Sequence, residues 1–216
     1  MTSFIHWQNT WKELGVSDPD ESLFRQLVAC YSEPHRKYHN MQHIEECFLH
    51  LRSLHSVISR PAEVELALWF HDAIYNTHRK DNEERSAEWV RESGLKVGLS
   101  NDLVSRIYDL VMITKHNTIP KSTDAEILVD IDLGILGAEA ERFDEYEIQI
   151  QQEYSWVPEH LYRTERRKIL KGFLNRQNLY CTEHFRSSFE IQAKKNLTRS
   201  LAQLSIRKDI STNPSS

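Results

Sequence analysis

The stretch Leu66-Ala67-Leu68-Trp69-Phe70-His71-Asp72 places a histidine and an aspartate directly after the most apolar segment of the chain. Pro61 precedes this segment and suits the first turn of a helix, and Val64 adds to its apolar character. A helix that is apolar on nearly every face is buried. We therefore expect a central core helix that opens at Pro61 and carries His71 and Asp72 at its C-terminal end.

The rest of the sequence repeats apolar residues at the three- and four-residue spacing of amphipathic helices. The fold class is therefore all-α. We expect a single helical domain over residues 1–206, a bundle of about nine helices, and a disordered polar tail over residues 207–216. Helices are expected from Phe4 to near Gly15, from Asp18 to before Pro34, from Asn40 to Ser59, from Pro61, from Asn82 to about Ser93, after Ser100, from Thr123, and over Ala138–Tyr154, Pro158–Arg176 and Thr182–Leu204.

Two local signals fix ends within this pattern. Gly94 follows an amphipathic run and is expected to close that helix. Thr123 and Glu126 have the spacing of a capping box, which predicts a helix start at Thr123. In the C-terminal helices, Phe185, Phe189 and Leu197 face an unknown side, where they would pack on the core or on a second copy of the chain.

Composition excludes several classes of protein. The longest apolar run is five residues, so no segment resembles a membrane-spanning helix. The net charge of −5 disfavours general binding to nucleic acids or to membrane surfaces. Three widely spaced cysteines indicate reduced thiols and a cytoplasmic location. The chain has only 6 glycines, which suits long helices, and 11 histidines, which makes a metal or acid–base site worth seeking.

Four short segments carry groups suited to chemistry, and each has an ordinary structural alternative. His39 and His43 could be two polar residues at a helix entrance. His71-Asp72 could be a hydrogen-bonded pair at a helix end. Asp130 or Asp132 could be a metal ligand or part of a solvated helix face, and only one of them is expected to reach a shared site. The last segment is Lys115-His116, which would bind an anionic group or simply complement the negative end of a helix.

Taken together, His43, His71-Asp72 and Asp132 resemble the H…HD…D signature of the HD superfamily of metal-dependent phosphohydrolases. The wider context is similar to a bacterial and fungal family described as predicted HD-superfamily phosphohydrolases. The segments that carry this resemblance are Arg36-Lys37-Tyr38-His39-Asn40-Met41-Gln42-His43-Ile44, Leu68–Tyr75, Asp81–Ala87, Asp130–Gly137 and Arg166–Leu174.

The resemblance implies an HD-domain-like helical bundle in which His43, His71, Asp72 and Asp132 bind the metal. The segment around His39 also resembles the start of cyclic-nucleotide phosphodiesterase catalytic domains, where the first histidine is a general acid. That likeness makes His39 the acid, in place of the simpler interpretation that both histidines bind metal. Imidazole and carboxylate ligands suit Mn, Fe, Co, Ni or Zn, with Mg as an additional ion, and either one or two ions.

The implied reaction is the cleavage of a phosphate ester in a nucleotide or another small phosphorylated metabolite, by a metal-activated water. Asp72 would act as the base. His39, or Lys115 and His116, would stabilise or protonate the leaving group. Further groups have supporting roles. Arg36, Lys115 and Arg166 are candidates for phosphate contact, with a solvated helix face as the alternative for Arg166, and Asn82 and Glu83 are candidates for a second layer around the metal.

Other functions remain as alternatives. A non-catalytic regulatory module would keep the pocket to sense a nucleotide, and would bind metal without turnover. A purely structural helical protein would bind no metal, and would have to satisfy its buried His71, Asp72 and Asp132 with protein groups alone.

Overall fold

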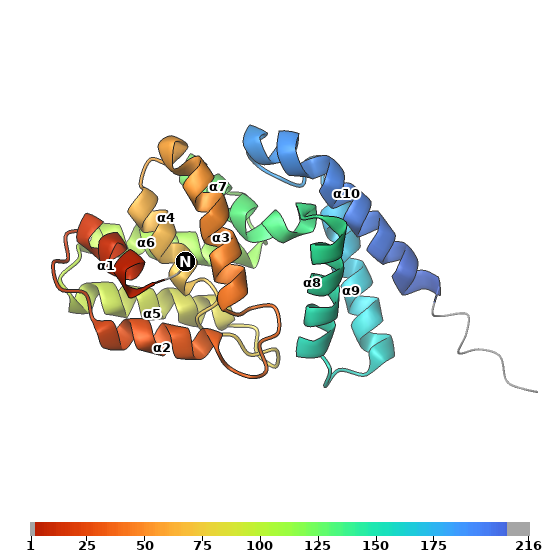
Figure 1. Ribbon diagram of the computed structural model, residues 1–216, viewed down its shortest axis with the longest axis horizontal. Coiled ribbons are helices and arrows are strands. Elements are labelled where there is room, and N and C mark those ends of the chain that lie inside the picture. The colour runs from red at the N-terminus through yellow and green to blue at the C-terminus, as the bar shows by residue number, and fades with distance from the viewer. Residues whose placement is uncertain (1–2, 207–216) are drawn as a thin grey trace, which may run out of the picture. The chain divides into compact units, whose positions relative to one another are not determined.

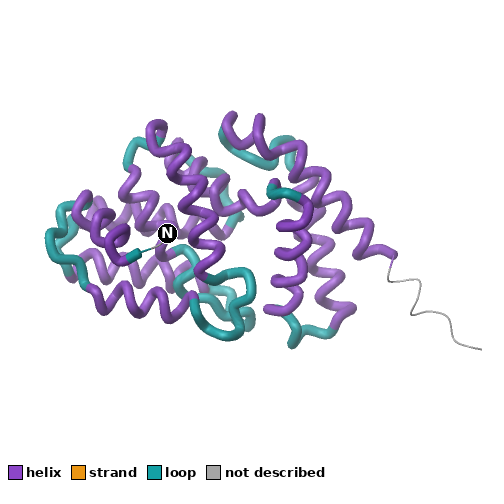
Figure 2. The backbone as a smooth tube through the Cα atoms, viewed as in Figure 1, coloured by secondary structure: helices purple, strands orange, loops and turns teal. Residues whose placement is uncertain are grey.

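The computed structural model describes residues 3–206, and within that range the regular elements are all helical (Figure 1; Figure 2). The all-α prediction is confirmed, with ten α-helices and three short 3₁₀ helices in the described part of the chain. The tail predicted over residues 207–216 lies outside the described residues. Backbone contacts divide the chain into two compact units, Met1–Asp132 and Leu133–Ser216, and the expectation of one domain over residues 1–206 stays a prediction.

The first unit holds most of the elements that carry predicted site residues. It contains α1 (Phe4–Glu13), α2 (Glu21–Tyr31), α3 (Met41–Leu54), η1 (His55–Val57), α4 (Pro61–Phe70), α5 (Asn82–Lys96), α6 (Asn101–Met112), η2 (Ile113–Lys115) and α7 (Thr123–Asp132). The second unit contains η3 (Leu133–Gly137), α8 (Ala140–Glu153), α9 (Glu159–Leu174) and α10 (Glu183–Ile206).

Helix α4 is the centre of the first unit, as its apolar sequence predicts. Val64 and every residue from Leu66 to Phe70 are fully buried. The helix contacts α1, α3, α5, α6 and α7, so it is covered on several sides. Full burial of a large aliphatic or aromatic side chain contributes about 1.5–3 kcal/mol relative to exposure. The end of α4 is therefore a firmly held position from which to present His71 and Asp72.

The start of α4 is fixed by a side chain from α7. The Asp124 carboxylate accepts the backbone N–H groups of Ser59 at 2.8 Å and of Arg60 at 3.1 Å. The predicted end of α3 at Ser59 is wrong: α3 ends at Leu54, η1 follows it, and Ser59 donates to Asp124 just before α4. Helix α7 starts at Thr123, as predicted, but its cap is Ser122 and not Thr123, since the hydroxyl of Ser122 accepts the N–H of Ala125 at 3.2 Å.

Gly94 corrects a further boundary. It lies inside α5, which continues to Lys96, and the positive backbone φ of 87° belongs to Gly98. A Cβ atom on Gly94 would lie 2.7 Å from Cγ1 of Val104 on α6. The glycine is therefore there to let α5 and α6 pack closely, and it does not end the helix.

The second unit is a set of helices in which α10 packs against α9 and η3. The side-chain amide of Asn196 donates to the carbonyls of Leu136 at 3.0 Å and Ala138 at 2.8 Å, which ties α10 to the start of the unit. Phe185 and Leu197 are fully buried.

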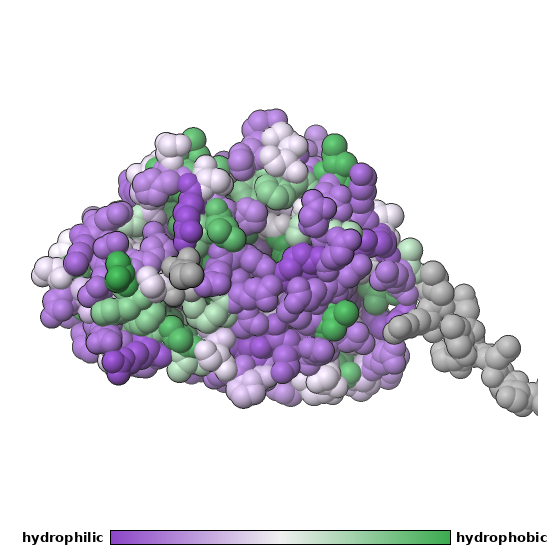
Figure 3. Space-filling view, viewed as in Figure 1, coloured by the Kyte–Doolittle hydropathy of each residue, from purple (hydrophilic) through white to green (hydrophobic). Residues whose placement is uncertain are grey.

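The face drawn in Figure 3 is mostly hydrophilic, with hydrophobic residues in small separate patches. Within residues 3–206, no helix combines the length and the apolar character needed to cross a lipid bilayer.

Candidate metal centre

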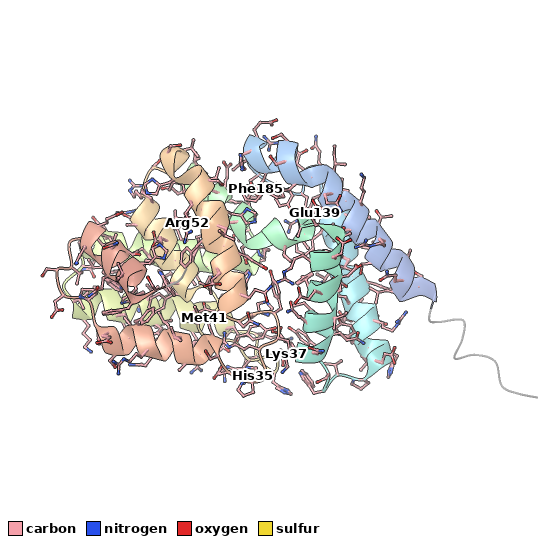
Figure 4. The ribbon with its side chains drawn as sticks, in the orientation of Figure 1. His35, Lys37, Met41, Arg52, Glu139 and Phe185 are labelled. Atoms are coloured by element: carbon pink, nitrogen blue, oxygen red, sulfur yellow. The ribbon has the colours of Figure 1, made fainter. Side chains whose placement is uncertain are left out.

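The start of α3 separates the two histidines of the first predicted segment. Figure 4 labels Met41, the first residue of the helix. Asn40 caps this end, because its side-chain oxygen accepts a backbone N–H from the first turn at 2.8 Å. His43 lies inside the first turn and is 2% exposed, whereas His39 precedes the cap. The two rings lie 6.0 Å apart, so they do not form a pair on one helix face.

The end of α4 orients His71. Its backbone N–H still donates to the carbonyl of Ala67 at 2.9 Å, which keeps His71 on the helical path. Nδ1 of His71 lies 2.8 Å from the carbonyl oxygen of Leu68. A carbonyl only accepts hydrogen bonds, so Nδ1 carries a proton and Nε2 is the ring nitrogen directed at the cluster.

Four side-chain atoms from α3, α4 and α7 converge. Nε2 of His43 lies 3.0 Å from Nε2 of His71. The same His43 atom lies 3.6 Å from Oδ2 of Asp72 and 3.4 Å from Oδ1 of Asp132. Nε2 of His71 lies 3.1 Å and 3.5 Å from those two oxygens.

These separations match the spacing of ligands around one ion. With bonds of about 2.1 Å, two ligands are about 3.0 Å apart at a right angle and about 3.4 Å apart at the tetrahedral angle. The five measured distances between donor atoms lie close to that range. The donor set, two imidazole nitrogens and two carboxylate oxygens, could therefore hold a single metal ion.

Asp132 joins the cluster from the last residue of α7. Its Oδ1 atom faces the two histidines, and its Oδ2 atom lies 2.9 Å from Nε2 of His116. His116 has a left-handed backbone conformation, with φ 54° and ψ 23°. Such a conformation is uncommon for a residue with a side chain, and residues held in it are often found at functional sites. The structure thus places His116 behind a carboxylate of the cluster.

The charges of the cluster depend on one another. Burial lowers the pKa of His71, but the carboxylates of Asp72 and Asp132 raise it by more, so that it stands well above its usual value. Burial raises the pKa of Asp72, but His71 and His39 lower it below its usual value. Burial also raises the pKa of Asp132, and its contacts with His116, His43 and His71 then bring it well below the usual value. The two buried carboxylates thus favour positive charge on His71, and a metal ion at the same place would supply that charge instead.

Cys47 lies one helical turn after His43 and was not among the predicted site residues. His43, Cys47 and His71 form a cluster that could hold a metal ion, with ligand-type atoms within 4.8 Å of one another. However, Sγ of Cys47 is 3.8 Å from both ring nitrogens of His43. A sulfur equally distant from both nitrogens lies off the lone-pair direction of each nitrogen. An ion bound to Nε2 of His43 would therefore lie closer to the carboxylate oxygens than to this sulfur. Burial and the charges of Asp132 and Asp72 raise the pKa of this thiol well above its usual value.

Lys115 is the last residue of η2, and Glu83 lies in the first turn of α5. The Lys115 ammonium donates to the Glu84 carboxylate, and this bond raises the pKa of the lysine. Burial raises the pKa of Glu83, and the charge of Asp72 adds to this effect. Lys115 is therefore paired with an acidic residue, and Glu83 is close enough to Asp72 for the two carboxylates to interact.

Asn82, at the start of α5, holds the preceding loop. Its side-chain oxygen accepts the N–H of Asn76 at 3.2 Å, and its amide donates to the carbonyl of the same residue at 3.0 Å. This pairing shapes the loop that follows the His71-Asp72 segment.

Arg36 is buried, and its guanidinium donates to protein groups. Nε donates to Glu33 at 2.9 Å, Nη1 to the carbonyl of Asp72 at 2.5 Å, and Nη2 to the carbonyl of Ala73 at 2.8 Å.

Arg166 belongs to the second unit and is also buried, so the solvated-face alternative is wrong. It donates to Glu147, and its guanidinium lies 5.1 Å from the centre of the Tyr146 ring.

Sequence reasoning did not find three features of this centre. They are the Leu68 carbonyl that orients His71, the left-handed backbone at His116, and the contacts of Arg36. No sequence signal marks the first or the second. The third had a weak signal, because Arg36 precedes the first histidines closely enough to suggest some role beside them.

In comparisons with known proteins, no family model, no curated protein and no solved structure matches this chain.

Proposed function

We propose that this protein is a metal-dependent phosphohydrolase that resembles the HD superfamily. The observation that carries the proposal is the set of separations between donor atoms of His43, His71, Asp72 and Asp132, which lie between 3.0 and 3.6 Å. Two histidines and two aspartates from three separate helix ends would be a costly group to bury without a shared cation.

The proposed cofactor is a divalent transition metal: Mn, Fe, Co, Ni or Zn. The mixed nitrogen and oxygen donors favour these ions over Ca²⁺, which prefers oxygen ligands alone. Mg²⁺ is a candidate for a second position, which would depend on Asp72 and water. When bound, the ion would lower the pKa of a water molecule and offset the charge of phosphoryl oxygens.

The side chains around the cluster then have distinct roles. Asp72 accepts a proton from the attacking water. His39, which lies beside the cluster and outside the proposed ligand set, donates a proton to the leaving oxygen. Lys115 provides positive charge toward the phosphoryl group once it is released from Glu84. His116 holds the second oxygen of Asp132, so that the first stays directed at the histidines.

The proposed substrate is a nucleotide or another small phosphorylated metabolite, cleaved at a monoester or a diester bond. The net charge of −5 argues against long nucleic acids, whose binding is dominated by contacts to many phosphates. We propose a cytoplasmic location, no membrane partner and, as the protein partner to test, a second copy of the chain.

Metal content and turnover together test the proposal. Protein purified without chelator should contain about one or two first-row ions per chain, and His71→Ala and Asp72→Ala should lose them. His50→Ala, on α3 but away from the donor set, is the matched control. Unchanged metal content in His71→Ala would refute the site.

A panel of nucleotides and sugar phosphates, assayed with added Mn²⁺, should then show phosphate release that EDTA abolishes. Tight binding of one panel member without any turnover would favour the sensing module over the enzyme. Absence of bound metal, with a stable fold, would favour the structural protein.

A further inference from the structure

The guanidinium of Arg36 lies at the meeting point of the segments that carry Asp72 and His39, and its side chain is 1% exposed. We infer that Arg36 is a positioning residue, which fixes the end of α4 and the loop before α3 relative to each other, and that it does not contact the substrate phosphate. The inference rests on the proposed function, because it assigns how two groups of that same site are held.

The first support is the set of groups that accept hydrogen bonds from Arg36. Nη1 donates to the carbonyl of Asp72 at 2.5 Å and points to that of His39 at 3.4 Å, while Nη2 donates to the carbonyl of Ala73 at 2.8 Å. Asp72 and Ala73 belong to the turn that follows α4, which ends at Phe70, so their carbonyls need partners from outside the helix. A cation there also complements the helix dipole. Arg36 therefore holds the turn that follows α4, at the residue that carries a proposed metal ligand.

The second support is a stack of rings that reaches the proposed acid. The guanidinium carbon of Arg36 lies 5.2 Å from the centre of the Tyr31 ring and 5.6 Å from that of the Tyr75 ring. The Tyr75 ring is stacked on His39, with centroids 4.1 Å apart and planes inclined by 26°. Arg36 thus touches the backbone of His39 directly and its imidazole through Tyr75.

The third support is the number of donors that remain. A guanidinium has five N–H groups. Three carbonyls and the Glu33 carboxylate, at 2.9 Å from Nε, account for four contacts. A phosphate could engage Arg36 in its usual two-pronged manner only by displacing the Glu33 carboxylate or one of the backbone carbonyls. Phosphate binding would therefore cost Arg36 at least one of the contacts that hold it.

The two roles predict different results for Arg36→Lys. A lysine keeps the charge that a phosphate needs, but its single ammonium cannot replace a planar group that spans several carbonyls. We expect both Arg36→Lys and Arg36→Gln to weaken the binding of Co²⁺, in the absence of any phosphate, by about 10- to 100-fold, as is usual for residues that orient metal ligands.

The experiment is a Co²⁺ titration of the full chain, followed by the visible absorption of the bound ion, on chelator-treated protein at a temperature where each variant is folded. Arg106→Lys is the matched control: Arg106 donates to Glu63 at 2.8 Å in the same unit, away from the donor set. Its Co²⁺ affinity should stay within roughly twofold of the unmodified protein. Glu33→Gln removes the negative charge that faces Nε of Arg36. Because the Glu33 side chain is partly exposed, this variant should fold and supplies a second test if Arg36→Lys does not fold. It should weaken Co²⁺ binding more than Arg106→Lys does.

Three outcomes would overturn the inference. One is an Arg36→Lys variant that binds Co²⁺ normally while its KM for a phosphate ester rises, since Arg36 would then be a phosphate contact. The second is normal Co²⁺ binding by Glu33→Gln when Arg36→Lys cannot be studied. The third is an unmodified protein that takes up no Co²⁺. This result would refute the metal centre itself, and it differs from a failure of the Arg36 inference because it is seen without any variant.

Discussion

Nε2 of His116 lies 2.9 Å from Oδ2 of Asp132, and it reaches that oxygen from a backbone with φ of 54°. The contact is therefore made at the expense of an unfavourable backbone conformation. A left-handed residue with a Cβ atom is less stable than a right-handed one by roughly 1–2 kcal/mol.

This relationship predicts that two substitutions of His116 weaken metal binding equally but differ in their effect on stability. His116→Gly and His116→Ala both remove the imidazole behind Asp132, so each should weaken metal binding by about 10- to 100-fold. The glycine variant should nevertheless be more stable than the alanine variant by about 1 kcal/mol, because glycine adopts positive φ without penalty. Metal titration and urea unfolding measure the two effects, and equal stability of the two variants would contradict the argument from backbone strain.

His39 should be separable from the metal ligands. His39→Gln should lower kcat by about 10²- to 10⁴-fold, the usual contribution of a general acid, while metal content stays unchanged. The comparison is His43→Gln, which should lose both metal and turnover. If His39→Gln loses its metal as well, His39 is itself a ligand and its role as the acid is wrong.

Glu84 should restrain Lys115. Because the ammonium is paired with the Glu84 carboxylate, Glu84→Gln should free the cation and lower the KM for a phosphate ester, whereas Lys115→Met should raise it. Neither change removes a donor of the metal cluster, so Co²⁺ affinity serves as the internal control. A rise in KM for both variants would mean that the ion pair itself shapes the site.

Two glycines provide a matched test of packing. Gly94→Ala should destabilise the protein by about 1–3 kcal/mol, because the new Cβ would lie 2.7 Å from Cγ1 of Val104. Gly172→Ala on α9 meets nothing within 4 Å and should stabilise by about 0.5–1 kcal/mol, because alanine favours the helix. Denaturant unfolding measures both, and effects of the same sign would refute the close approach of α5 and α6.

Glu190 should make the second unit sensitive to acid. Burial raises the pKa of this carboxyl, but Lys194 and the backbone N–H groups of Leu179 and Tyr180 lower it by more, so it stands below its usual value. A pKa that is lower in the folded state means that the carboxylate stabilises the fold above about pH 4.5, and that this stability is lost as pH falls through the folded pKa. The difference in unfolding free energy between the unmodified protein and Glu190→Gln should therefore shrink from about pH 6 to about pH 3. A difference that grows over that range would contradict the expected sign.

The helices could be predicted from sequence because apolar spacing and capping residues act locally. Pro61 at the start of α4 and Gly15 after α1, which has a φ of 92°, are where their local signals place them. The contact of Asp124 with the two residues before α4 could not be predicted, since donor and acceptor are more than 60 residues apart. The role of Gly94 was missed for the same reason: a glycine required by a neighbouring helix looks in sequence like a glycine that ends its own.

In the candidate site, too, the residue types could be predicted from sequence but their surroundings could not. The residue types at His43, His71, Asp72 and Asp132 were evident in the sequence, and the structure brings these side chains together. The open choice between Asp130 and Asp132 depended on the direction of each side chain, which the sequence alone does not give. The surroundings of Arg36 and Arg166 could not be predicted either, because the sequence does not show whether an arginine side chain is buried or exposed.

Asp132 is the last residue of the first compact unit, and the other donors lie 60 or more residues before it. During synthesis, the chain emerges with His43, His71 and Asp72 long before Asp132. The full ligand set therefore exists only after the whole unit has been made and α7 has docked against α3 and α4. Under the proposed function, the chain would bind its metal ion tightly only after this unit has folded, and a partly synthesised chain would bind it weakly.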